Sequence, residues 1–136
     1  MSLIETLPQK LGANAQWTEE GGVLWLDPSP LTVRELCAEM NAAKARFVTI
    51  TAYQLPGAEG IRLEYHWDLN GKLMGFRFPV KDNSIESIYD ICEAADWIER
   101  EVHEEYSIDF TGRVYEPLLL RKGNATGVNL REEVKR

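Results

Sequence analysis

The alternation of apolar and polar residues is clearest around Asn70-Gly71, a dipeptide typical of the two-residue type I′ turn of a β-hairpin. Pairing the chain outward from this turn places the large apolar side chains on one face. On the other face Glu64 lies opposite Arg77, an attractive charge pair, and His66 and Asp68 share that side. We therefore expect a strand pair with one buried face. Its predicted pairs are Leu69 with Lys72, Trp67 with Met74, Tyr65 with Phe76 and Leu63 with Phe78.

Two other stretches have the composition of strands. Residues 47–53 are mostly β-branched or aromatic, and the loop 55–60, with Pro and Gly, separates them from the hairpin. Trp17 and residues 23–26 flank Glu19-Glu20-Gly21-Gly22, which is typical of a tight connection between two short strands. Together with the hairpin, these stretches predict an antiparallel sheet of about 4–5 strands.

Helix signals occur first near the N-terminus. Ser2 and Thr6 are overlapping candidate starts, each followed three residues later by Glu or Gln. Because Pro8 is tolerated only in the first turn of a helix, it favours the start at Thr6. We expect this short helix to end near Gly12.

Two longer helical patterns follow. Thr32 and Glu35 form a capping box, and the helix that it opens should run to about Ala45. After residue 83 the pattern turns helical again, to about Tyr106. The buried stripe predicted for the first of these helices is Val33, Leu36, Cys37, Met40 and the stem of Lys44.

No repeat and no linker divides the chain. We therefore expect a single α+β domain over residues 1–120, with helices packed on one face of the sheet. Residues 121–136 form a polar C-terminal tail, which we expect to be poorly ordered in isolation and to fold against a partner.

The composition excludes several classes of protein. The chain has 136 residues and a net charge of −7, with Lys and Arg spread along it, so no footprint for nucleic acid or an anionic membrane is present. No apolar run approaches the roughly 20 residues of a membrane span, and no signal peptide is visible. Cys37 and Cys92 lack the number and spacing of iron–sulfur ligands. We expect a cytoplasmic, cofactor-free protein that meets a membrane only through a partner.

Residues 87–112 carry the most distinctive pattern in the chain. They contain an Asp-Ile pair, an Ala-Ala-x-Trp step, a Glu-Arg-Glu triplet and an aromatic-x-Ile ending before Phe-x-Gly. This pattern resembles the signature of the 30-kilodalton subunit family of respiratory complex I, and the likeness covers roughly residues 47–120. The matching positions are Asp90, Ala94, Ala95, Trp97, Glu99, Arg100, Glu101, Tyr106, Ile108, Phe110 and Gly112.

The chain departs from that family's pattern at several places. Glu86 and Glu93 stand at positions of proline, Ser107 at a position of glycine, and Arg113-Val114 where the family usually has His-Pro. The ending over residues 117–120 is similar to that of the small accessory subunits of energy-converting, membrane-bound nickel–iron hydrogenases. The resemblance therefore points to a hydrogenase-type branch.

The resemblance implies a structural subunit without catalytic residues of its own, in an energy-converting hydrogenase or an NADH:quinone oxidoreductase. It implies docking against the hydrogenase-like large subunit, near the iron–sulfur small subunit. A nickel–iron centre or iron–sulfur clusters would then belong to those partners. The chain would lie in the cytoplasm, peripheral to the membrane through the complex.

Helix phase indicates which residues would meet such a partner. At 100° per residue, Ala95, Ile98, Val102 and Tyr106 fall on the side that faces the sheet. Trp97 falls nearly opposite, among Glu93, Arg100, Glu101 and Glu104. Because Trp and Arg are enriched at binding hot spots, we interpret these five residues as a partner interface. An isolated exposed Trp, or one covered by the tail, is the alternative.

The alternative function is a small stand-alone metal-binding enzyme or sensor that uses His66 and His103. Glu99 and His103 lie one turn apart and would offer two metal ligands, but zinc needs three or four. We therefore interpret them as a surface pair or a structural hydrogen bond. His66 beside Asp68 resembles a base oriented by a carboxylate, but no pattern places a nucleophile with it.

Overall fold

The computed structural model describes residues 2–55 and 60–115, which form an α+β domain of three α-helices, a five-stranded sheet and a two-stranded sheet. The predicted fold class is confirmed. The first half comprises α1 (Leu3–Leu11), β1 (Thr18–Glu20), β2 (Val23–Trp25), α2 (Val33–Ala42) and β3 (Arg46–Gln54). The second half comprises β4 (Ile61–Leu69), β5 (Lys72–Pro79), β6 (Ser84–Glu86), the 3₁₀ turn η2 (Glu93–Ala95), α3 (Asp96–Tyr106) and β7 (Asp109–Thr111).

The large sheet has the strand order β1-β2-β5-β4-β3. The hairpin of β4 and β5 pairs in the predicted register, with Trp67 opposite Met74 and Glu64 opposite Arg77. The expectation of a wholly antiparallel sheet is wrong at one junction, because β2 and β5 run parallel. A strand's residue pattern indicates which face is buried, but it does not set the direction of the neighbouring strand.

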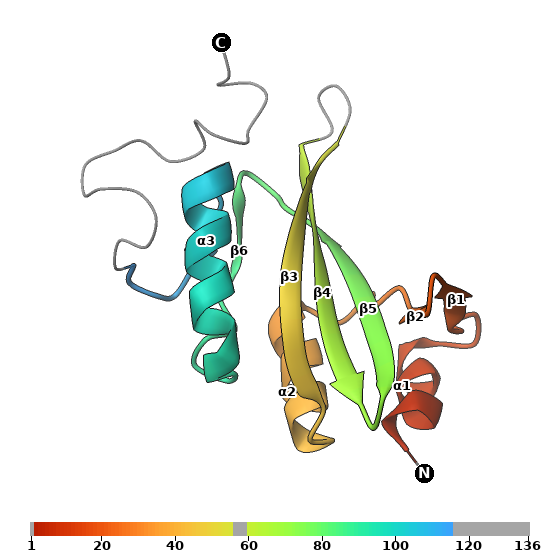
Figure 1. Cartoon of the computed structure of the whole chain (residues 1–136). Coiled ribbons are helices and arrows are strands. Elements are labelled where there is room, and N and C mark those ends of the chain that lie inside the picture. Colours follow the sequence, from red (N-terminus) through yellow and green to blue (C-terminus); the bar gives the residue numbers. More distant parts are fainter. Residues whose placement is uncertain (1, 56–59, 116–136) are drawn as a thin grey trace.

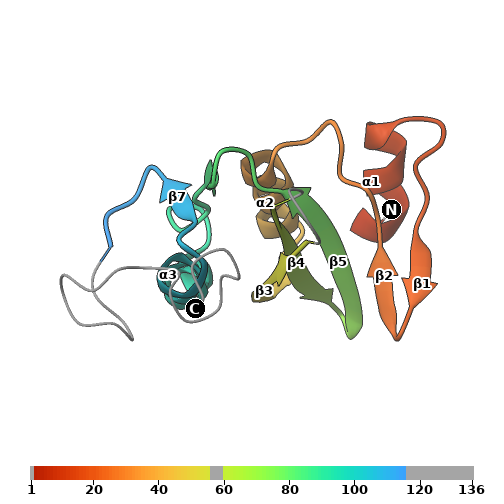
Figure 2. The ribbon, with the colours of Figure 1, turned by 90° about the horizontal axis from the view of Figure 1, so that it is seen from above.

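The two faces of the large sheet are covered differently. Helices α1 and α2 lie on one face, and α3 lies beside the β3 edge, next to β6 (Figures 1 and 2). The covered face carries the largest core side chains, Trp67, Tyr65 and Phe76, all fully buried. No described helix lies in front of the other face of β4 and β5 in Figure 1. The prediction of helices on one face therefore holds for α1 and α2.

The start predicted for the first helix is wrong, because α1 begins at Leu3 and contains Pro8 in its interior. A proline has no N–H to donate to the carbonyl four residues earlier, here that of Ile4. The side chain of Trp17 supplies the missing donor, since its Nε1 lies 2.7 Å from the Ile4 oxygen. The predicted end at Gly12 is confirmed.

The capping box of α2 is confirmed, with Glu35 N–H donating to the Thr32 hydroxyl and Thr32 N–H to the Glu35 carboxylate. The helix ends at Ala42 rather than near Ala45, because Lys44 adopts a left-handed φ of 61° that terminates it.

The continuous helix predicted after residue 83 is also wrong in its first half, because the α-helix begins only at Asp96. Residues 84–86 form β6, which pairs in parallel with β7, and turns occupy the chain up to η2. Only α3 has the expected helical form, and it ends at Tyr106 as predicted. A tertiary contact prevents the helix from starting earlier, because the Ser87 hydroxyl and the Ile88 N–H donate to the side chain of Glu99.

None of the helices in the described ranges is long and apolar enough to cross a membrane. The predicted polar tail, 121–136, lies outside the described residues.

Candidate functional site

The inner side of α3 is built around one buried carboxylate, that of Glu99, whose residue has no exposed surface. The Ser87 hydroxyl donates to Glu99 Oε1 at 2.6 Å, and the Ile88 N–H donates to Oε2 at 2.9 Å. These bonds tie the turn before η2 to the middle of α3. Of the two alternatives interpreted from the sequence, Glu99 is therefore not part of a surface pair with His103 but accepts structural hydrogen bonds, from Ser87 and Ile88.

Arg113 completes this cluster from the far end of the described chain. Its Nη1 lies 3.1 Å from Glu99 Oε1, and its Nη2 donates to the carboxylate of Asp96. Burial raises the pKa of Glu99, and the bonds from Ser87, Ile88 and Arg113 act in the opposite direction. The cluster joins three segments, which are residues 87–88, helix α3 and the segment that follows β7 at residue 113. We call Ser87, Asp96, Glu99 and Arg113 the Glu99 cluster.

The two histidines of the enzyme hypothesis contact different residues. His103 stacks on Tyr115 with ring centroids 3.7 Å apart, and its Nδ1 lies 2.8 Å from the Ile108 carbonyl oxygen, to which it donates. His66 contacts Trp25 edge to face at 5.3 Å, and burial lowers its pKa. Within residues 2–55 and 60–115, no group of three or more His, Cys, Asp or Glu side chains is arranged to hold a metal ion.

The outward side of α3 carries Trp97, which is 62% exposed. The guanidinium of Arg100 lies 5.5 Å from the centre of the Trp97 ring and pairs with Asp96, four residues earlier in the helix, at 3.6 Å. Glu93 is exposed and Glu101 is half-buried. Four of the five predicted interface residues thus lie fully or partly at the surface.

Glu104, the fifth predicted interface residue, is buried. It lies seven residues after Trp97 and so on the same side of α3. Helix phase predicts which side of the helix a residue lies on, but it does not predict whether other parts of the chain cover that side at a given turn. Glu104 is therefore not part of the exposed surface around Trp97.

The structure shows two further exposed apolar residues, Tyr89 and Val114, that the sequence analysis did not single out for the interface. Tyr89 is 38% exposed and lies under the guanidinium of Arg113, 4.8 Å from its ring centre. Val114 is 85% exposed and follows Arg113 in the chain. Because Arg113 also bonds Asp96, the first residue of α3, Tyr89 lies near the start of α3 with the Arg113 guanidinium beside it. Sequence reasoning missed this grouping, because Arg113 lies 14 residues beyond Glu99 and no local pattern links the two.

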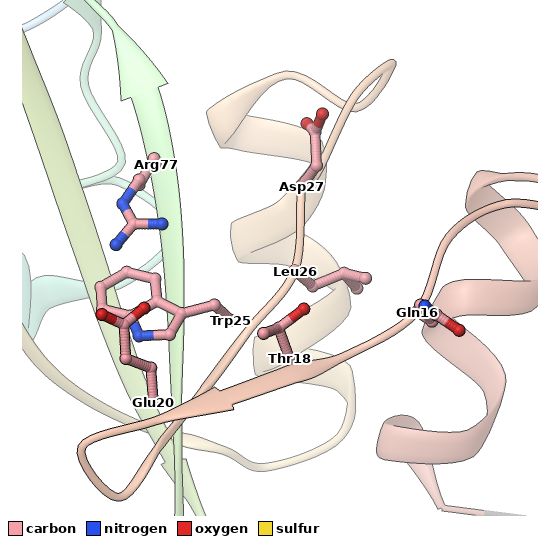
Figure 3. Close-up of a pocket in the computed structure, with 7 residues that line it drawn as sticks. All are labelled: Gln16, Thr18, Glu20, Trp25, Leu26, Asp27 and Arg77. Atoms are coloured by element: carbon pink, nitrogen blue, oxygen red, sulfur yellow. The ribbon is translucent and has the colours of Figure 1, made fainter.

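A second feature lies on the uncovered face of the sheet. Trp25 lies across Gly75, where a Cβ atom would come within 2.6 Å of the Trp25 ring. The guanidinium of Arg77 stacks above the same ring at 3.9 Å from its centre (Figure 3). Beside them is an open hollow of about 490 Å³. Its lining residues are Gln16, Thr18, Glu20, Trp25, Leu26, Asp27 and Arg77.

Comparison with known proteins identifies the family. The profile of the family described as "Respiratory-chain NADH dehydrogenase, 30 Kd subunit" matches residues 29–135. A trypsin-resistant fragment of Nqo5 has a similar fold, with a TM-score of 0.60 and 21% identity over 84% of this chain and 96% of that chain. A chain in the structure of the membrane-bound sulfane sulfur reductase, an archaeal respiratory membrane complex, gives a TM-score of 0.68 and 20% identity over 89% of this chain and 76% of that chain. The profile match covers most of the sequence, and the chain belongs to the family of the 30 Kd subunit of the respiratory-chain NADH dehydrogenase.

Proposed function

We propose that this chain is a cofactor-free structural subunit of a membrane-associated, complex I-related oxidoreductase, and that it docks on the hydrogenase-like large subunit. The observation that carries the proposal is Trp97, an exposed tryptophan on a helix whose other side is held by the Glu99 cluster. A rigid base beneath an exposed aromatic side chain is the arrangement expected of a binding hot spot.

The surroundings of Trp97 support the same proposal. Tyr89 and Val114 add exposed apolar area, and Arg100 lies over the Trp97 ring. Interfaces are enriched in aromatic residues and Arg, and their cores are depleted of other charges. Glu93 and Glu101 lie farther along the same surface and fit a polar rim.

We further propose that the parent complex is of the hydrogenase type, with the iron–sulfur small subunit as a second neighbour. The departures from the family pattern support this, above all Arg113-Val114 in place of His-Pro. In such a complex the nickel–iron centre and the iron–sulfur clusters belong to the partners, and the chain lies on the cytoplasmic side of the membrane. The alternative of a metal-binding enzyme or sensor gains no support from the contacts of His66 and His103 described above.

The test is purification of the native complex through a tag on this chain. We expect a nickel–iron-hydrogenase-like large subunit to co-purify, and Trp97→Ala to weaken its binding at least about tenfold with the fold intact. Val48→Ala, which shortens an exposed apolar side chain on β3, is the control and should leave binding unchanged. Recovery of the wild-type chain only as a free monomer at low salt would reject the proposal.

A further inference from the structure

The uncovered face of the large sheet carries a connected row of large aromatic and charged side chains. Arg62 lies over the ring of Tyr53 at 5.6 Å, and its Nη2 lies 3.3 Å from Glu64 Oε2. Arg77 donates its Nε to the same oxygen at 2.9 Å. Arg77 then covers Trp25, which contacts His66. We call Tyr53, Arg62, Glu64, Arg77, Trp25 and His66 the cross-sheet row.

The row crosses four neighbouring strands, β3, β4, β5 and β2, and its members hold one another in place. Trp25 rests on the bare backbone of Gly75, which has no side chain to displace it. The Glu64 side chain is only 6% exposed, whereas those of Arg62 and Arg77 are 36% and 42% exposed. The carboxylate therefore lies beneath, and the two guanidinium groups lie outermost.

We infer that the cross-sheet row is a second docking surface of this chain, and that it binds a segment of a partner protein through a carboxylate side chain. Tyr, Trp and Arg are the residues most enriched at interface hot spots. Glu64 takes only the Nε of Arg77 and one Nη of Arg62, and both arginine side chains are partly exposed, so other guanidinium N–H groups are left for a ligand. A carboxylate is the side chain that such N–H groups bind in pairs.

Charge also indicates where the carboxylate binds and what supplies it. Glu20 and Asp27 line the hollow beside Arg77 and disfavour an anion there, so the carboxylate fits over Arg62 and Arg77. Residues 116–136 of this chain contain five Lys and Arg against three Glu, which makes them a poor occupant. The local positive charge of the partly exposed Arg62 and Arg77 side chains favours a carboxylate in spite of the net charge of −7 of the chain. The occupant that we infer is an acidic segment of a partner protein, and a second copy of this chain is an outcome that the experiment below distinguishes.

This inference shares with the proposed function only the premise that the chain has protein partners, because Trp97 lies on α3 and not in the row. The experiment uses the intact complex, purified through the tagged full-length chain with Arg77→Lys in place. The substitution keeps the positive charge and adds an amine that a zero-length carbodiimide cross-linker joins to a carboxylate in direct contact. Lys72, on the same strand but paired with Leu69 on the core side, is the internal control.

We expect mass spectrometry to find a new cross-link between position 77 and an Asp or Glu of a partner subunit, which wild type lacks and which Lys72 does not make. Cross-links from position 77 only to Glu64, only to another copy of this chain, or to nothing would overturn the inference. A complex that fails to form in wild type would instead count against the proposed function.

A charge-removal variant gives an independent readout. Arg77→Gln leaves Arg62 to pair with Glu64 and should weaken binding of the partner several-fold at low salt, with the difference narrowing as salt is added. Lys72→Gln removes the same charge from the core-side face and should leave binding unchanged. An equal effect of the two variants would contradict the inference, because it would reflect net charge alone.

Discussion

At the scale of single residues, Glu99 is the side chain on which the packing of α3 depends most. Its Oε1 accepts from Ser87 and Arg113, and its Oε2 accepts from the Ile88 N–H. In Glu99→Gln the side-chain NH2 group would replace one of the two accepting oxygens, so at least one of these donors would lose its hydrogen-bond acceptor. We expect a loss of about 1–3 kcal/mol in the free energy of unfolding, measured by urea denaturation. Glu101→Gln, on the partly exposed side of the same helix, should change it by less than about 0.5 kcal/mol.

The two cysteines provide a second test at this scale. Burial raises the pKa of Cys37 to about 12, and burial also raises that of Cys92. Cys37 is fully enclosed by the core, whereas Cys92 is partly exposed. Because only the thiolate of an accessible cysteine alkylates quickly, iodoacetamide at about pH 8 should label Cys92 slowly and Cys37 only after unfolding. Peptide mass spectrometry reads both sites, and labelling of Cys37 in the folded protein would contradict the expectation.

At the scale of elements, α1 depends on a donor from outside the helix. Pro8 leaves the Ile4 carbonyl without its helical partner, and Trp17 Nε1 bonds that oxygen. Trp17→Phe should therefore cost about 1 kcal/mol of stability. In the Pro8→Ala background the alanine N–H can bond Ile4 itself, so the same substitution should cost clearly less. A double-mutant cycle by urea denaturation measures this coupling, and equal costs in both backgrounds would refute the explanation.

The elements that the sequence predicts correctly are those specified by local residues. The Asn70-Gly71 turn determines the register of β4 and β5, and the Thr32–Glu35 capping box marks the start of α2. Errors arose where a distant residue decides the structure. Trp17 permits a proline inside α1, and Glu99 holds residues 87–88 out of a helix. Patterns of spacing contain no information about such long-range hydrogen bonds.

At the scale of the whole molecule, the family signature was recognisable from sequence, but the burial of the charged residues of α3 was not. Trp97 lies at the surface as helix phase predicts, whereas Glu99 and Glu104 are buried. A charged residue on a helix is usually exposed, so burial of two such residues could not be predicted without their neighbours. Of the cross-sheet row, the sequence placed only Glu64, Arg77 and His66 on a common face, because Trp25 reaches the row through the parallel pairing of β2 with β5.

Arg113 and Tyr115, at the end of the described residues, pack back against α3 through Glu99 and His103. Their removal tests how much these contacts contribute to the stability of the fold. Tyr115 stacks on His103, and its hydroxyl donates to the Phe110 carbonyl at 3.2 Å. A chain ending after Gly112 would leave Glu99 buried without Arg113, whereas one ending after Tyr115 keeps the contact. We expect the shorter chain to be less stable by about 3–5 kcal/mol, the cost typical of breaking a buried ion pair.

The pH dependence of that difference distinguishes a lost charge partner from lost packing. Burial raises the pKa of Glu99 and Arg113 opposes the rise, so the pKa is higher still in the chain ending after Gly112. A carboxyl group with a raised pKa in the folded state destabilises that state as pH rises through the folded pKa, and this penalty disappears below the unfolded pKa. The stability gap between the two truncated chains should therefore narrow as pH falls from about 8 to about 5. Urea denaturation across that range measures the difference in free energy of unfolding between the two chains. A difference that does not change with pH would mean that it comes from the packing of Tyr115 rather than from the charge of Arg113.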